Sequence, residues 1–212
     1  MLSAIHQNYL QSVNNLSIKN IGLTGKNPSV ACLIVDYSKS PKGIVLSYGL
    51  TSQNGRPHAE INALNKLPQN KINNKTVMYI SLEPCFKNNS CCAKAIANAG
   101  IKKVFISSLD PNPNIKGKGI KFLKQQNIKV IHSSKSLDKF QKINKYFYTH
   151  QTLNRPFITL KIAISKNGFS KSPTIKNITS EQTQYFMHRM RLSHDAIAVG
   201  MNTLLDLSLI HI

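Results

Sequence analysis

Acidic residues are scarce in this chain of 212 residues. Its 8 aspartates and glutamates face 28 lysines and arginines, which gives a formal net charge of +20. A strongly basic surface suits either nucleic acid or a phosphorylated small molecule. The lysines are scattered along the chain rather than gathered in one run, and the abundance of lysine, asparagine and isoleucine together is typical of an AT-rich genome. Charge alone therefore does not indicate a nucleic-acid partner.

Long apolar runs are missing as well. No stretch approaches the roughly 18 residues that a membrane-spanning helix needs, and the chain shows no signal-peptide pattern. Together with a count of only four cysteines, these absences favour a soluble protein in a reducing compartment, and we expect it in the bacterial cytoplasm. Repeats and low-complexity tracts are also absent, and the length allows one domain plus part of another.

Only three glutamates occur in the chain, and two of them lie in motifs with metal-binding residue types. His58-Ala59-Glu60 is followed by Glu83-Pro84-Cys85 and then by Cys92. One imidazole and two thiolates fill three positions of a tetrahedral zinc site and leave the fourth for water. A glutamate beside that water can take its proton and pass it to a leaving amine. This order of residue types is typical of the zinc nucleobase deaminases, although the cysteine spacing here is wider.

Each part of this pattern also has an ordinary explanation. A lone His-x-Glu is common, and Cys85, Cys91 and Cys92 could be buried thiols, since free cysteine is among the most buried residue types. Cys91 is only one position away from Cys92 as a candidate ligand. Cys32 lies in an apolar, strand-like run and is expected in the core. Glu83 precedes a proline, and we expect it to brace its loop rather than to take part in chemistry.

Apolar patterning predicts an α/β protein with three layers, α/β/α, because short helices alternate with strands. The expected helices are Leu2–Asn14, Ala59–Lys66, Cys92–Asn98, Ile120–Gln126 and Ser180–Arg191. The expected strands are Ser29–Val35, Gly43–Ser47, Val77–Ile80, Lys103–Ile106, Ile128–Ile131, Phe157–Ile164 and Ala196–Val199. Residues 132–150 form a polar, partly helical connector in this prediction, and a domain boundary is expected near residue 150.

Segments along nearly the whole chain match one known family. They are Asn27-Pro28-Ser29-Val30, Pro57-His58-Ala59-Glu60, Leu82-Glu83-Pro84-Cys85, Asp110-Pro111-Asn112-Pro113 with Gly117 and Gly119, Asn144, Phe147, Arg155-Pro156, Thr159-Leu160-Lys161, Asp195-Ala196-Ile197, Val199-Gly200 and Thr203. With these residues the chain resembles the bifunctional deaminase/reductase of riboflavin biosynthesis. The Asp-Pro-Asn-Pro segment with its two glycines is the specific part, because nucleic-acid deaminases of the same fold differ there.

The resemblance implies a zinc-dependent cytidine-deaminase-like domain over residues 1–150. It implies that His58, Cys85 and Cys92 bind Zn²⁺ and that Glu60 is the proton shuttle. The implied substrate is 2,5-diamino-6-(5-phosphoribosylamino)pyrimidin-4(3H)-one, a small pyrimidine ribosyl phosphate whose exocyclic amine is replaced by water. The implied substrate-binding residues are Asn27, Asp110 and Asn112, the last two near the ribose phosphate.

For residues 151–212 the resemblance implies the N-terminal part of a dihydrofolate-reductase-like α/β domain. In the family this domain reduces the ribosyl chain with NADPH, and the implied cofactor-binding residues are Lys161, Arg191 and Thr203. After Asp206, however, residues 207–212 depart from the family and resemble translated sequencing-adapter DNA. We therefore expect a truncated gene fragment without reductase activity and with exposed apolar side chains in its C-terminal third. A natural short form that has lost its reductase is the alternative.

The segment between the two metal-binding cysteines departs from the family pattern. The family usually has a longer loop with a His-x-Gly-x-Thr-Pro-Pro pattern, whereas only residues 86–91 intervene here. Counting back from Gly100 puts Cys92 at the ligand position and Cys91 where proline normally stands. Two other functions therefore stay open: a tRNA or other nucleic-acid deaminase of the same fold, and a zinc-stabilised module without activity. We expect no membrane or nucleic-acid partner, and a homo-oligomer is compatible with the sequence.

Overall fold

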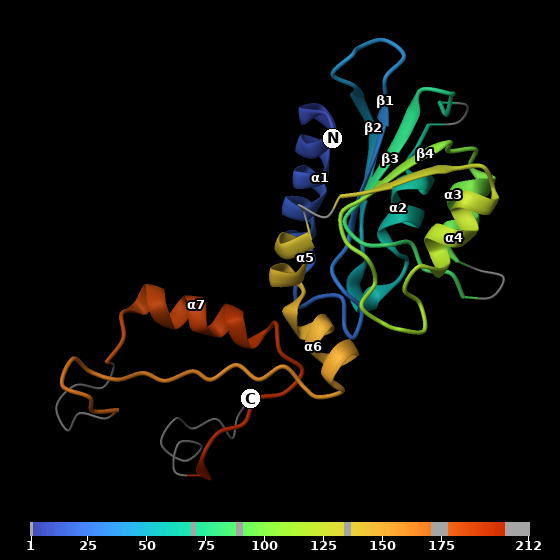
Figure 1. Cartoon of the computed structure of the whole chain (residues 1–212). Coiled ribbons are helices and arrows are strands. Elements are labelled where there is room, and N and C mark those ends of the chain that lie inside the picture. The colour runs from blue at the N-terminus through green and yellow to red at the C-terminus, as the bar shows by residue number, and fades with distance from the viewer. Residues whose placement is uncertain (1, 69–70, 88–90, 134–136, 171–177, 202–212) are drawn as a thin grey trace. The chain divides into compact units, whose positions relative to one another are not determined.

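The computed structural model describes residues 2–68, 71–87, 91–133, 137–170 and 178–201 (Figure 1). By its internal contacts the chain divides into two compact units, Met1–Ile158 and Thr159–Ile212. The first unit contains all the strands of the described residues.

A five-stranded mixed sheet with the order β2-β1-β3-β4-β5 forms the centre of the first unit. The strands are β1 (Ala31–Asp36), β2 (Ile44–Leu50), β3 (Thr76–Ile80), β4 (Lys103–Ile106) and β5 (Lys129–His132). Strand β1 is antiparallel to both β2 and β3, whereas β3, β4 and β5 run parallel. Because parallel neighbours need crossover connections, a helix follows each of β3 and β4.

Helices cover both faces of this sheet (Figure 1). Helix α1 (Ala4–Ser17) lies on one face, where its Leu10 and Val13 pack with Leu33, Tyr79 and Phe105. The other face carries α2 (Ala59–Asn65), α3 (Cys92–Asn98) and α4 (Lys118–Gln125). Helices α5 (Leu137–Ile143) and α6 (Lys145–Leu153) then follow. The three-layer prediction is thus confirmed, and the helices and strands expected up to residue 132 are present with ends shifted by a few residues.

Gly49 allows α2 to lie directly against β2. A Cβ atom at this position would lie 2.0 Å from the carbonyl oxygen of Ala59 and 2.5 Å from the amide nitrogen of Ala63. The hydroxyl of Ser47 donates a hydrogen bond to the carbonyl oxygen of Ala63 at 2.8 Å. Strand β2 continues to Leu50, beyond the expected end at Ser47. Its contact with α2 sets the position of the helix that begins after His58.

Replacing Gly49 with alanine is expected to lower the free energy of unfolding by roughly 1–3 kcal/mol, the usual cost of overpacking. Urea unfolding measures this difference. The matched control is Val45→Ala on the same strand, where the side chain is 45% exposed, and it should change stability by no more than about 0.5 kcal/mol. A Gly49→Ala protein as stable as the control would contradict the close packing of α2 on β2.

The described part of the second unit contains the helix α7 (Glu181–Arg191), which confirms the helix expected there. The backbone N–H of Thr183 donates to the Ser180 hydroxyl at 3.3 Å, which caps the helix.

The strands expected over Phe157–Ile164 and Ala196–Val199 are wrong, since these residues form no strand. Alternating apolar residues become a strand only beside a hydrogen-bonding neighbour, and the described residues offer these segments none. Their apolar side chains are exposed, as expected: Ile158, Leu160, Ile162 and Ile197 are exposed by 59–80%.

Candidate metal centre

Three side chains predicted as metal ligands come together beside the start of two helices. His58 is the N-cap residue of α2, Cys92 is the first residue of α3, and Cys85 lies in the segment between β3 and α3. Nδ1 of His58 is 3.3 Å from Sγ of Cys92 and 3.6 Å from Sγ of Cys85. The ligand atoms of all three residues lie within 4.8 Å of one another.

This arrangement fits a zinc ion. Zinc bonds of about 2.3 Å to sulfur and 2.0 Å to nitrogen, at tetrahedral angles, separate a sulfur from a nitrogen ligand by roughly 3.5 Å. The two sulfur–nitrogen distances in the protein are close to that separation. One imidazole and two thiols are also a donor set that zinc prefers. Three protein ligands leave one coordination position for water or substrate.

The two thiols hold their protons very differently. The neighbouring Cys92 thiol and the His58 imidazole lower the pKa of Cys85 to about 4. The same contact with Cys85, together with burial, raises the pKa of Cys92. The pKa of His58 is raised, mainly by its hydrogen bond with Cys85. Because zinc binds cysteine as thiolate, metal binding would release the proton that Cys92 retains.

Glu60 lies in the first turn of α2, beside these ligands, and only 3% of it is exposed. Burial raises its pKa to about 7, and the charge of His58 and a hydrogen bond with Cys92 oppose that rise. A carboxyl group that titrates near neutral pH can both accept and release a proton. The geometry and the protonation of Glu60 therefore suit a proton shuttle.

The other two cysteines lie apart from the ligand group. Cys91 is the N-cap residue of α3 and belongs to the apolar core together with Ala93 and Ile96. Cys32 in β1 is fully buried, which confirms it as a core residue. Among the described residues, the group of candidate ligand atoms includes Cys92 and not Cys91.

Glu83 connects the metal-ligand segment to the loop that follows β4. Its Oε2 accepts hydrogen bonds from the amides of Gly117 at 3.0 Å and Asp110 at 3.4 Å, and its Oε1 accepts one from Ile120 at 3.4 Å. The side chain is 3% exposed. A Cβ at Gly119 would lie 2.0 Å from the Pro84 carbonyl oxygen, so the start of α4, directly after this loop, packs on Pro84. Glu83 thus braces its surroundings, as expected from the sequence.

Glu83→Gln is expected to lower the free energy of unfolding by about 1–3 kcal/mol, because a buried backbone donor loses its acceptor. A glutamine has one acceptor oxygen, whereas Glu83 uses both of its oxygens for backbone N–H groups. Chemical unfolding of this variant measures the loss. The control is Glu181→Gln, which removes the same charge from an exposed position and should leave stability nearly unchanged. Equal stability of the two variants would show that Glu83 does not brace the loop.

The predicted substrate-binding residues lie in two loops of the first unit. Asp110 is 5% exposed; burial raises its pKa to about 6, and Glu83 and Cys85 add to that rise. Its Oδ1 accepts a hydrogen bond from the Asn112 amide at 2.8 Å. Asn27, in the other loop, donates from Nδ2 to the Gly55 carbonyl oxygen at 3.3 Å. The Asp110 amide also donates to Glu83, which directly precedes Pro84 and Cys85, while the side chains of Asp110 and Asn27 shape their own loops.

Two side chains of the expected connector hold these loops, and their role was not predicted. Asn144 accepts a hydrogen bond from the Ser29 amide at 2.8 Å and is fully buried. The Tyr148 hydroxyl donates to the Leu109 carbonyl oxygen at 3.2 Å, directly before Asp110. The family resemblance had singled out Asn144 without a role, and the partners of both side chains lie far away in the sequence.

Of the three residues implied to bind the reductase cofactor, two lie in the described part of the second unit. Lys161 is exposed. Arg191 ends α7, with Nη1 3.1 Å from Nδ1 of His188. Thr203 lies outside the described residues. NADPH binding at these positions stays a prediction, as does the assignment of residues 151–212 to a reductase domain.

Comparison with known proteins agrees with this site. Residues 3–108 match the cytidine and deoxycytidylate deaminase zinc-binding region. The riboflavin biosynthesis protein RibD of Aquifex aeolicus is 34% identical over 209 residues, which cover 97% of this chain and 56% of that protein. The diaminohydroxyphosphoribosylamino-pyrimidine deaminase of Buchnera aphidicola is 41% identical over 135 residues, which cover 63% of this chain and 86% of that protein. The chain belongs to the RibD deaminase family.

Solved RibD structures share the fold. Form 1 of RibD from Acinetobacter baumannii superposes with a TM-score of 0.83 at 29% identity, covering 95% of this chain and 56% of that one. This likeness confirms the cytidine-deaminase-like α/β architecture. The chain spans about half the length of the RibD proteins it matches: the shared sequence covers 56% of one of them and 52% of another. Among the described residues, no helix combines the length and apolar character needed to cross a membrane.

Proposed function

We propose that this chain hydrolytically deaminates 2,5-diamino-6-(5-phosphoribosylamino)pyrimidin-4(3H)-one in riboflavin biosynthesis. The observation that carries the proposal is the cluster of His58, Cys85 and Cys92, with ligand atoms within 4.8 Å of one another and the buried Glu60 beside it. The proposal is also supported by 41% identity to a relative named as a diaminohydroxyphosphoribosylamino-pyrimidine deaminase. The shared sequence covers 86% of that relative, so residues 1–150 are proposed to suffice for deamination.

His58, Cys85 and Cys92 would hold a zinc ion. As a Lewis acid the zinc would lower the pKa of water enough for it to act as a nucleophile near neutral pH. Glu60 accepts a proton from the attacking water while a bond forms between the water oxygen and the ring carbon that bears the amine. Glu60 then gives a proton to the departing nitrogen, the carbon–nitrogen bond breaks, and ammonia leaves. The burial of Glu60, which raises its pKa to about 7, suits both transfers.

The substrate would lie between the metal centre and the loops that carry Asn27, Asp110 and Asn112. Asp110 supports this placement, because its carboxyl group is near enough to Cys85 and Glu83 for both to raise its pKa. Tyr148 and Glu83 hold the two sides of that loop through backbone hydrogen bonds. A loop fixed in this way is pre-organised for binding.

Ammonia release from four candidate substrates tests the proposal. The zinc-loaded chain is incubated with the diaminopyrimidinone ribosylamine 5′-phosphate, cytidine, dCMP and tRNA, each at the same concentration. We expect release from the first compound alone. Release from tRNA but not from the aminopyrimidine would overturn the proposal in favour of a nucleic-acid deaminase. Retained zinc without turnover of any of the four would indicate a zinc-stabilised module without activity.

A further inference from the structure

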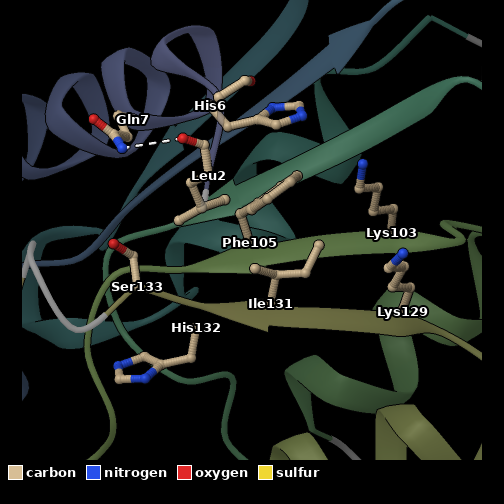
Figure 2. Close-up of a pocket in the computed structure, with 10 residues that line it drawn as sticks. Leu2, His6, Gln7, Lys103, Phe105, Lys129, Ile131, His132 and Ser133 are labelled. Carbon is tan, nitrogen blue, oxygen red and sulfur yellow. Dashed lines mark hydrogen bonds between the residues drawn. The ribbon is translucent and has the colours of Figure 1, made fainter.

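A groove of about 550 Å³ lies at the opposite face of the sheet from the metal centre. It is open between the start of α1 and strands β4 and β5 (Figure 2). The side chains that matter for its chemistry are Leu2, His6, Lys103, Phe105, Lys129 and Ile131. None of its lining residues is acidic, so the groove gathers positive charge without a balancing carboxylate.

Two lysines face each other across adjacent strands in this groove. Lys103 of β4 and Lys129 of β5 are paired in register, and Figure 2 shows their ammonium groups on the same side of the strands. Like charges at directly opposed strand positions are destabilising. Burial and then the charge of Lys129 lower the pKa of Lys103. The Lys103 ammonium lies over the Phe105 ring, 5.0 Å from its centroid, which keeps it at the groove.

His6 adds a third group, held in a fixed orientation. Its ring packs on Phe105 with the ring centroids 4.2 Å apart. Its Nδ1 lies 2.5 Å from the Tyr79 hydroxyl, which is itself 2.6 Å from the Tyr37 hydroxyl. Within the described residues, the second ring nitrogen, Nε2, makes no hydrogen bond and can contact a ligand. Burial and then the charge of Lys103 lower the pKa of His6.

The start of α1 borders the same groove: Leu2 and Ser3 lie directly before the helix, and His6 and Gln7 lie in its first turn. The helix has 14 residues, no acidic residue in its first turn and no side-chain hydrogen bond at its N-cap. The start of a helix carries a partial positive charge from its free N–H groups. This charge adds to that of the two lysines, so three sources of positive charge meet at this groove.

We propose that this groove binds an organic phosphate of about nucleotide size, with the phosphate between Lys103, Lys129 and His6. The volume lies within the usual range for small-molecule sites, and it exceeds what a single inorganic ion would fill. Leu2 and Ile131 offer apolar contact to the organic part of such a ligand. The groove lies on the α1 face, whereas α2 and α3, which carry the metal ligands, lie on the other face. It is therefore a second site, independent of the deaminase proposal.

Calorimetric titration of the full chain with AMP, inorganic phosphate and adenosine tests this proposal. We expect AMP to bind, inorganic phosphate to compete with it, and adenosine not to bind. The variant Lys103→Gln/Lys129→Gln should bind AMP at least about tenfold more weakly, because charge-assisted hydrogen bonds to phosphate are strong. The matched control is Lys121→Gln/Lys124→Gln, which removes two exposed lysines from α4 and should bind AMP like the unchanged protein.

Thermal unfolding without ligand supplies a second measurement that does not depend on AMP. Because Lys103→Gln/Lys129→Gln removes the repulsion between the two lysines, its midpoint temperature of unfolding should be at or above that of Lys121→Gln/Lys124→Gln. Equal AMP affinity in the two variants would overturn the proposal, as would the absence of AMP binding by the unchanged protein. Adenosine binding as tight as AMP binding would also overturn it, because the phosphate would then not be the recognised group.

Discussion

Glu60→Gln is expected to lower the rate of ammonia release by about 10²–10⁴-fold, the usual contribution of a general acid–base group. Glutamine keeps the size of the side chain but cannot carry a proton. Glu60 is buried in the first turn of α2, next to the metal ligands, and its pKa near 7 suits proton transfer at neutral pH. The variant should still bind about one zinc per chain, because Glu60 is not one of the three ligands.

The control for this variant is Glu181→Gln, which changes an exposed glutamate of the second unit. It should release ammonia at the rate of the unchanged protein. Zinc content, measured on the same samples, separates loss of the proton shuttle from loss of the metal. Ammonia release near the unchanged rate by Glu60→Gln would contradict the role assigned to Glu60.

Cys92→Ser is expected to remove zinc from the purified protein, whereas Cys91→Ser should retain it. Cys92 has its sulfur 3.3 Å from Nδ1 of His58, and Cys91 packs in the apolar core instead. Losing one of three protein ligands leaves too few for a tight site. Because zinc binding contributes to folding stability, Cys92→Ser should also unfold at a lower temperature, and added chelator should not lower it further.

Elemental analysis of the two serine variants and of the unchanged protein provides the comparison. Each variant carries the same chemical change at neighbouring positions, so each is the control for the other. If only Cys91→Ser loses zinc, the ligand register is displaced by one residue and the assignment of Cys92 is wrong.

Two of the three proposed metal ligands could be placed from the sequence because His58 and Cys92 lie at the starts of short helices, whereas Cys85 lies in the segment between β3 and α3. The apolar pattern predicted α3 to begin at Cys92, and the helix begins there. His58 was expected directly before a helix and is the N-cap of α2. Local patterning thus predicted both helix starts, and the motif gave the residue types that meet between them.

Contacts between distant segments could not be predicted. Asn144 binds Ser29 across 115 positions of the chain, and no local pattern contains that information. The strand expected over Phe157–Ile164 failed for a related reason. Its alternating apolar residues satisfy the strand pattern, but strand formation depends on hydrogen-bonding neighbours that the described residues of the second unit do not supply.

The most direct test of the central claim is ammonia release from the diaminopyrimidinone ribosylamine 5′-phosphate under single-turnover conditions, with zinc content measured on the same sample. The account predicts that protein with about one zinc per chain converts the substrate to the aminouracil and that Glu60→Gln, equally loaded, does not. Fully zinc-loaded, folded protein that releases no ammonia from this substrate would contradict the account.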